Sequence, residues 1–91
     1  MKPERIQQRM VEVPAWTPVD RVRAMMRTFA FNHFESAAAF VDRVGQLSGA
    51  YQRWPDVRIR GAQVTLTLPG ATSGELTEDD FDLAVLIEHQ P

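Results

Sequence analysis

Three stretches of the chain alternate apolar and polar residues, which is the pattern of half-buried β-strands. The first covers residues 23–31 and ends in the alternation Arg27-Thr28-Phe29-Ala30-Phe31, which places Phe29 and Phe31 on one face. The second covers residues 57–60 and the third covers residues 64–68. The predicted inward positions of the third strand are Val64, Leu66 and Leu68.

Between the first two strands, apolar residues recur at spacings of three and four, which predicts an amphipathic helix. Asn32 is its expected N-cap, and Glu35 stands three residues later, as in a loose capping box. Gly49 is the expected end, in the left-handed conformation that often stops a helix. The predicted core positions are Phe34, Ala37, Ala38, Val41, Val44 and Leu47.

Two shorter helices are predicted nearer the ends of the chain. Residues 4–10 form the first, with Pro3 at its start. Thr77 is the expected N-cap of the last helix, which runs to about His89. The carboxylates that follow Thr77 suit the positive end of the helix dipole.

Pro14 and Pro18 bracket Trp16, so this stretch is predicted to be an irregular link or a very short strand, with Trp16 in the core. The expected order is helix, strand pair, helix, strand pair, helix. This order predicts an α+β fold in which an antiparallel sheet carries helices packed on one face.

The composition and the net charge further limit the class of protein and the kinds of binding site that can be expected. Ninety-one residues predict a single domain over residues 1–91, and 44% hydrophobic with 24% charged residues is typical of a globular chain. A net charge of −2 argues against a nucleic-acid surface. No apolar run has the length of a signal peptide or a membrane span, and there is no cysteine, so we expect a cytoplasmic protein without disulfides. With no cysteine and no paired histidines, neither a metal nor another cofactor is expected.

Several local motifs resemble the pterin-4a-carbinolamine dehydratase family over roughly residues 16–88. The matching pieces are Arg27-Thr28-Phe29-Ala30-Phe31, Phe40-Val41-Asp42-Arg43-Val44, Pro55-Asp56-Val57, Val64-Thr65-Leu66-Thr67-Leu68 and the run from Gly74 to Ala84. The resemblance implies a small α+β domain that forms homodimers or homotetramers by extending the sheet and packing helices. It also implies an active site that removes water from a 4a-hydroxytetrahydropterin, with histidines as the acid and the base.

This chain departs from the family at the positions that carry the chemistry. The two histidines of the family's His-His-Pro motif fall on Arg53 and Trp54, and a third histidine falls on Ala71. A threonine of the family falls on Gly70, and a glutamate falls on Gly49. The family's proline and an aspartate are retained as Pro55 and Asp80.

Arginine keeps its proton in proteins and tryptophan offers only an indole donor, so these replacements cannot perform the usual proton transfers. We therefore expect a family member that has lost catalysis and acts as a protein-binding or assembly module. The chain is similar in size, charge and lost histidines to a branch of Rubisco assembly factors in α-carboxysome-forming bacteria. Rubisco large subunit is accordingly a candidate client, and another branch of the family serves as a dimerisation cofactor of a transcription factor. The alternative is an active dehydratase in tetrahydrobiopterin recycling.

Candidate binding residues are Tyr51, Arg53, Trp54, Pro55 and Asp80. Trp54 either fills the space left by the histidines or contacts a partner. A retained ligand site is a third possibility, in which Arg53 holds an anion and Trp54 stacks on a flat ring such as a pterin.

The remaining charged and sulfur-containing residues have simpler interpretations. Asp80 either caps the last helix or is a relic of the pterin pocket. The acidic run over residues 75–82 either binds a basic partner or caps and solvates its helix. His33 and His89 are interpreted as surface residues, and Met25-Met26 as core rather than contact residues.

Overall fold

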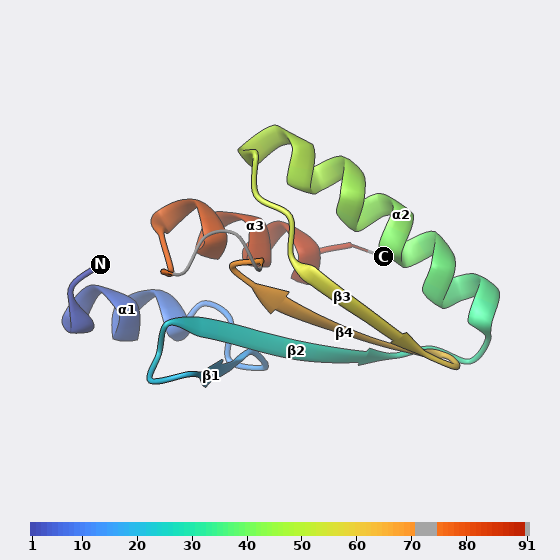
Figure 1. Cartoon of the computed structure of the whole chain (residues 1–91), viewed down its shortest axis with the longest axis horizontal. Coiled ribbons are helices and arrows are strands. Elements are labelled where there is room, and N and C mark those ends of the chain that lie inside the picture. Colours follow the sequence, from blue (N-terminus) through green and yellow to red (C-terminus); the bar gives the residue numbers. More distant parts are fainter. Residues whose placement is uncertain (71–74, 91) are drawn as a thin grey trace.

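A four-stranded antiparallel sheet carries helices α2 (Phe34–Tyr51) and α3 (Glu78–Glu88) on one face, while α1 (Pro3–Met10) lies beside the first turn of α3 (Figure 1). The computed structural model describes residues 1–70 and 75–90. The elements are α1 (Pro3–Met10), β1 (Thr17–Val19), β2 (Ala24–Ala30), α2 (Phe34–Tyr51), β3 (Asp56–Arg60), β4 (Gln63–Leu68) and α3 (Glu78–Glu88). The predicted α+β order and the antiparallel sheet are confirmed.

The sheet order is β1-β2-β4-β3, which places β4 inside the sheet and β3 at its edge. The inward positions predicted for β4 are confirmed, because Val64, Leu66 and Leu68 are all fully buried. On either side of Leu66 the register places Arg27 of β2 and Val57 of β3. All five residues of β3 are exposed, and among the described residues no strand pairs with its outer edge.

The face of α2 that packs on the sheet is only partly the predicted one: Ala37 and Val44 are buried and Val41 and Leu47 are partly buried against the core, whereas the other two predicted positions are not. Its buried residues are Ala37, Phe40, Val44 and Ser48. The ring of Phe40 lies 4.6 Å from that of Phe29 and 5.1 Å from that of Phe31, and these contacts set the rotation of the helix. Phe34, which was expected in the core, is 56% exposed as a result, and Ala38 is exposed as well.

Both predicted ends of α2 are wrong by a few residues. The N-cap is His33 instead of Asn32, and it makes no side-chain capping bond. The left-handed residue at the other end is Gln52 (φ 55°, ψ 34°) instead of Gly49. The helix continues past Gly49 because the side chain of Tyr51 packs against the core, and the backbone N–H of Gln52 closes the last turn on carbonyls of α2.

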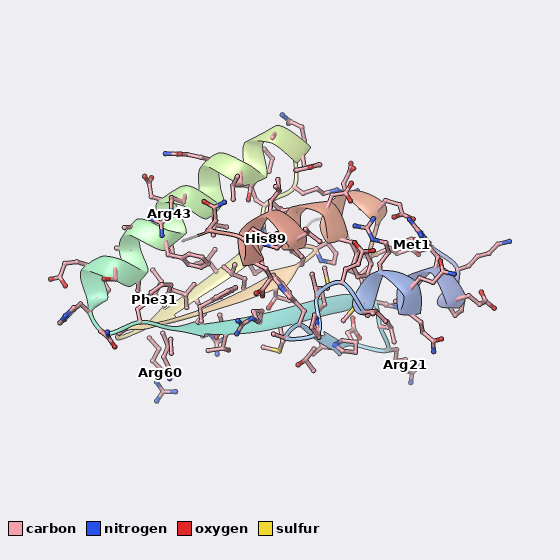
Figure 2. All side chains as sticks on the ribbon, turned by 180° about the vertical axis from the view of Figure 1, so that it is seen from behind. Met1, Arg21, Phe31, Arg43, Arg60 and His89 are labelled. Atoms are coloured by element: carbon pink, nitrogen blue, oxygen red, sulfur yellow. The ribbon has the colours of Figure 1, made fainter. Side chains whose placement is uncertain are left out.

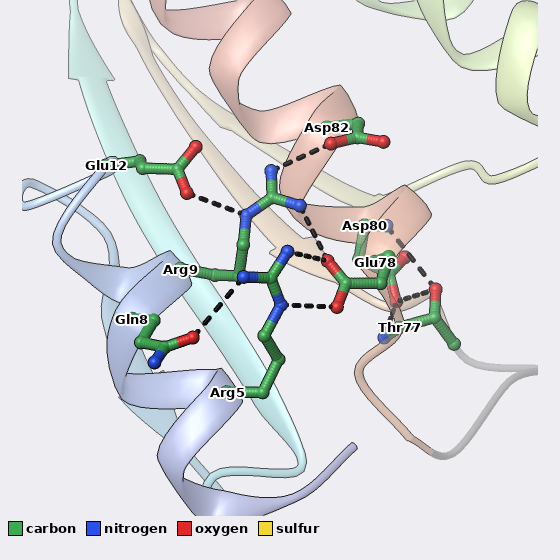
Figure 3. A network of polar contacts seen from close by, with 8 residues as sticks. All are labelled: Arg5, Gln8, Arg9, Glu12, Thr77, Glu78, Asp80 and Asp82. Carbon is green, nitrogen blue, oxygen red and sulfur yellow. Dashed lines mark hydrogen bonds and ion pairs between the residues drawn. The ribbon is translucent and has the colours of Figure 1, made fainter.

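A cluster of ion pairs fastens α1 to the first turn of α3 (Figure 3). Arg9 is only 7% exposed, and its two terminal nitrogens lie 2.7 Å from Glu78 Oε1 and Asp82 Oδ1. Arg5 adds a 2.7 Å contact to the other oxygen of Glu78. Hydrogen bonds from Arg5 and Arg9 lower the pKa of Glu78. The acidic run therefore does bind basic groups, and these come from the chain itself.

The structure also tests the predictions of which single residues are buried and which are exposed. Trp16 and Met25 are buried in the core, and Met26 is half-buried. His33 and His89 are exposed, as predicted. Within the described part of the chain, no helix combines the length and the apolarity needed to cross a bilayer.

Candidate functional site

The segment over residues 53–55, which the sequence comparison predicts to correspond to the family's His-His-Pro motif, links the C-terminal end of α2 to the start of β3. Tyr51 is the last helical residue and is half-buried. The backbone N–H of Arg53 donates to the carbonyl of Ser48 at 3.2 Å, which folds the chain back over the helix end. Arg53 and Pro55 are half-buried, whereas Trp54 is 53% exposed. Trp54 is therefore more exposed to solvent than the residues on either side of it.

Gly70, which follows β4, lies directly against this segment. A Cβ atom on Gly70 would collide with the carbonyl oxygen of Trp54 and would also come within 3.6 Å of Asp56 Oδ1. Only glycine permits so close an approach of two backbones. A threonine, which the sequence comparison predicts for the family at this position, would not fit the observed geometry. The sequence comparison noted this replacement but not its structural consequence.

Asp80 is fully buried and caps α3 in a complete capping box with Thr77 (Figure 3). Its Oδ2 accepts hydrogen bonds from the backbone N–H of Thr77 at 2.9 Å and from the Thr77 hydroxyl at 3.1 Å. Its Oδ1 has no hydrogen-bond partner among the described residues. The capping interpretation of Asp80 therefore accounts for one carboxylate oxygen and leaves the other unused.

The environment of Asp80 changes its acidity in two opposing ways. Burial raises the pKa of the carboxyl group and is the dominant cause. Hydrogen bonds from Thr77 and the positive charge of Arg53 lower it, but by less. The interaction with Arg53 also indicates that the fold brings these two candidate residues near each other.

The other predicted positions contribute little reactive chemistry. Gly49 lies within α2 with open space beside it, so the position of the family's glutamate is not filled by another group. Ala71 lies outside the described residues. His33 and His89 stand at the ends of α2 and α3, and neither is at this segment (Figure 2 labels His89). Asp80 is thus the one carboxyl group among the predicted site residues.

Two surface hollows lie elsewhere on the molecule. One, of about 360 Å³, is formed by α1 and the turn after β1, and includes Ile6 and Val22. The other, of about 330 Å³, lies over β3 and β4 and includes Met26 and Thr65. Neither hollow is lined by Arg53, Trp54 or Asp80. Among the described residues, no cluster of acidic and histidine side chains could hold a metal ion.

The ion-pair cluster next to Asp80 was missed from the sequence. Arg9 projects between Glu78 and Asp82, on either side of Asp80 in the chain, and its guanidinium carbon lies 5.5 Å from the centre of the Phe81 ring. One sequence feature did point to a basic surface on α1: Arg5 and Arg9 are four residues apart and therefore share one face of the helix. Nothing in the sequence indicated that this face would meet the acidic turn of α3.

Comparisons with known proteins identify the family. A profile described as Pterin 4 alpha carbinolamine dehydratase matches residues 1–90. Proteins described as "putative pterin-4-alpha-carbinolamine dehydratase" include one from Acidobacterium capsulatum, 36% identical over 97% of this chain and 94% of its own. Another, from a Roseiflexus species, is 39% identical over 91% of this chain and 87% of its own.

A solved structure agrees with the fold. The crystal structure of a transcriptional coactivator/pterin dehydratase from Brucella melitensis superimposes with a TM-score of 0.86. It is 20% identical in sequence and covers 97% of this chain and 94% of its own. With the family profile and the curated relatives, these observations establish that the chain belongs to the pterin-4a-carbinolamine dehydratase family.

Proposed function

We propose that this family member has lost dehydratase activity and works as a protein-binding module. The proposal rests on the residues that stand at the site. Arg53 and Trp54 replace the two histidines, while the buried carboxylate of Asp80 caps a helix. Dehydration needs one group to protonate the leaving hydroxyl and another to take a proton from the ring nitrogen. Arginine and tryptophan can do neither near neutral pH.

The contact between Gly70 and Trp54 supports the same proposal. Because the two backbones touch, the space between the segments that precede β3 and follow β4 is closed at this point. A flat bicyclic ring would have to separate them before it could lie there. Trp54 is meanwhile 53% exposed and can therefore contact another molecule.

Exposed apolar residues gather at the β3 edge and along the neighbouring helix. Trp54, Val57 and Ile59 are 53%, 43% and 41% exposed, and Phe34 at the start of α2 is exposed as well. Large apolar side chains left in solvent are typical of interaction surfaces, and tryptophan is enriched at the centres of such surfaces. Together with the unpaired edge of β3, this arrangement supports a homodimer in which the sheet continues from one copy into the next.

A second candidate function is dehydration by an altered mechanism, and one observation favours it. Asp80 has a buried oxygen without a described partner and a pKa raised by burial, which is a common profile for a catalytic acid. Under this alternative, Asp80 would supply the proton for the departing hydroxyl. The close contact between Gly70 and the carbonyl oxygen of Trp54 weighs against it.

An activity assay separates the two candidates. We expect the purified protein to convert a 4a-hydroxytetrahydropterin no faster than the spontaneous reaction, measured by the absorbance of the quinonoid product. An Asp80→Asn variant, which keeps the shape of the cap, should give the same rate as the unchanged chain. Turnover above background that disappears in Asp80→Asn would instead establish the dehydratase and refute the loss of catalysis.

We further propose Rubisco large subunit as the client, on the basis of the resemblance to short assembly factors that lack the same histidines. Co-purification of the two proteins after co-expression is the expected result. Trp54→Ala should lower the recovered Rubisco several-fold, whereas Val11→Ala, an exposed apolar residue on another part of the surface, should leave it unchanged. Failure to recover Rubisco with the unchanged chain would exclude this client.

A further inference from the structure

The hollow of about 360 Å³ beside α1 combines apolar and charged lining residues. Its apolar residues include Ile6 of α1, Leu76 before α3 and Val22 of the turn that joins β1 to β2. Leu76 is buried, whereas Val22 is 40% exposed. Pockets that bind small molecules begin at about 300 Å³ and have mostly apolar walls. The hollow therefore has the size and the apolar lining that a small ligand requires.

Two arginines of the β1–β2 turn also line this hollow. Within residues 1–70 and 75–90, neither Arg21 nor Arg23 forms an ion pair, whereas Arg9 and Arg27 both do. Glu75 lines the hollow as well, so two positive side chains and one negative side chain leave a local charge of +1 in a chain whose net charge is −2. Guanidinium groups bind carboxylates through paired hydrogen bonds. The charges at the hollow thus favour an anionic ligand.

The backbone of the same turn adopts an unfavourable conformation. Asp20, Arg21 and Val22 have φ angles of 50°, 55° and 64°, and the backbone N–H of Arg23 donates to the carbonyl of Asp20 at 3.0 Å. A positive φ is uncommon for residues other than glycine, and a β-branched residue such as valine rarely adopts it. Strained residues of this kind gather at binding sites. The turn holds two cationic side chains and one apolar side chain at the hollow (Figure 2 labels Arg21).

We infer that this hollow binds a small apolar carboxylic acid. The carboxylate contacts Arg21 and Arg23, and the hydrocarbon part lies against the apolar lining residues. Both parts are needed, because an exposed ion pair contributes little in water on its own. Residues 53–55 and Asp80 do not line the hollow, so the inference is independent of the proposed loss of catalysis.

Isothermal titration calorimetry with sodium octanoate, which is ionised at neutral pH, tests the inference. We expect saturable binding to a single site per chain. Shortening the acid to hexanoate and then to butanoate should weaken binding about two- to fourfold for each methylene removed. The uncharged 1-octanol should bind about tenfold more weakly than octanoate, because it cannot form the two ion pairs. Equal affinities for octanoate and 1-octanol, or no saturable binding of octanoate, would overturn the inference.

Charge variants locate the carboxylate. Arg21→Gln and Arg23→Gln should each weaken octanoate binding about two- to fivefold, the effect of losing an exposed ion pair, and should leave 1-octanol binding unchanged. Arg60→Gln is the matched control, because Arg60 is an exposed arginine of β3 that does not line the hollow. An equal loss in Arg60→Gln would indicate attraction to the charge of the whole chain and would overturn the site. Thermal unfolding of each variant checks that the fold is retained.

A bulky side chain locates the hydrocarbon part. Gln7 is an exposed residue of α1 that lines the hollow, whereas its neighbour Gln8 does not. Gln7→Trp should therefore abolish octanoate binding, and Gln8→Trp should retain it. Full binding by Gln7→Trp would place the ligand elsewhere and overturn the inference.

A peptide tests the other possible occupant of the hollow, a segment of another protein. A short synthetic peptide with leucine at its free C-terminus offers a carboxylate next to an apolar side chain. Titration of the protein with this peptide should show weaker binding than titration with octanoate. Binding of the peptide without binding of octanoate would assign the hollow to a protein segment and overturn the small-ligand inference.

Discussion

Replacing Phe81 with alanine is expected to cost about 3–5 kcal/mol of unfolding free energy, the usual range for truncating a buried aromatic residue. Phe81 is fully buried on α3, and its ring lies beneath the guanidinium of Arg9. The change would leave a cavity where α3 packs on the core and would remove this cation–π contact. Domains of this size have only about 5–14 kcal/mol of stability in total. Urea unfolding followed by circular dichroism should show the loss as a lower midpoint.

The matched control is Phe34→Ala, which makes the same change on the exposed start of α2. Since Phe34 is mostly in solvent, we expect a change of about 0.5 kcal/mol or less in the free energy of unfolding. The comparison also tests the rotation of α2, because the hydrophobic pattern had placed Phe34 in the core. Equal losses for the two variants would contradict the observed packing of this helix.

Replacing Gly70 with alanine is expected to destabilise the protein by about 1–3 kcal/mol, the usual cost of inserting an atom into a filled space. The added methyl group would collide with the carbonyl oxygen of Trp54, and backbone atoms cannot rotate away as a side chain can. The segment before β3 would have to move. Intrinsic fluorescence should report this movement, since Trp54 belongs to the displaced segment and Trp16 is buried in the core.

Gly45→Ala is the control for the Gly70 variant, with the opposite expected sign. Gly45 lies in the middle of α2, and no atom comes within 4 Å of the position of its missing Cβ. Alanine there should stabilise the helix by about 0.5–1 kcal/mol, because glycine loses more backbone entropy on folding. Thermal midpoints measured in the same buffer compare both variants. A stabilised Gly70→Ala would refute the close contact on which the closed site depends.

The strands could be predicted well because the alternation of apolar and polar residues that identifies a strand lies within the strand itself. Alternation placed Val64, Leu66 and Leu68 on one face, and all three are buried in β4. The N-cap of α3 was equally accessible, because Thr77 and Asp80 stand at the spacing that a capping box requires and form it in the structure. These features depend on a few neighbouring residues and on backbone periodicity.

Features that depend on distant segments could not be predicted in the same way. The end of α2 moved from Gly49 to Gln52 because Tyr51 finds a place in the core, and a left-handed non-glycine residue is tolerated there. Arg9 looked like an ordinary polar residue of a short helix until α3 supplied its two carboxylates. In both cases the deciding contact joins residues from different elements.

The features of the candidate site can also be separated into those that the sequence predicts and those that depend on the tertiary structure. The sequence alone was enough to predict that Arg53 and Trp54 occupy the positions of the family's two histidines, and the identity of a side chain determines which protons it can transfer. Packing in three dimensions was needed to learn that Trp54 is exposed, that Gly70 abuts its carbonyl and that one oxygen of Asp80 is left without a described partner. The reactions open to a side chain depend on its residue type, which the sequence gives directly. Burial and close contacts depend on segments that are far apart in the sequence and meet only in the folded protein.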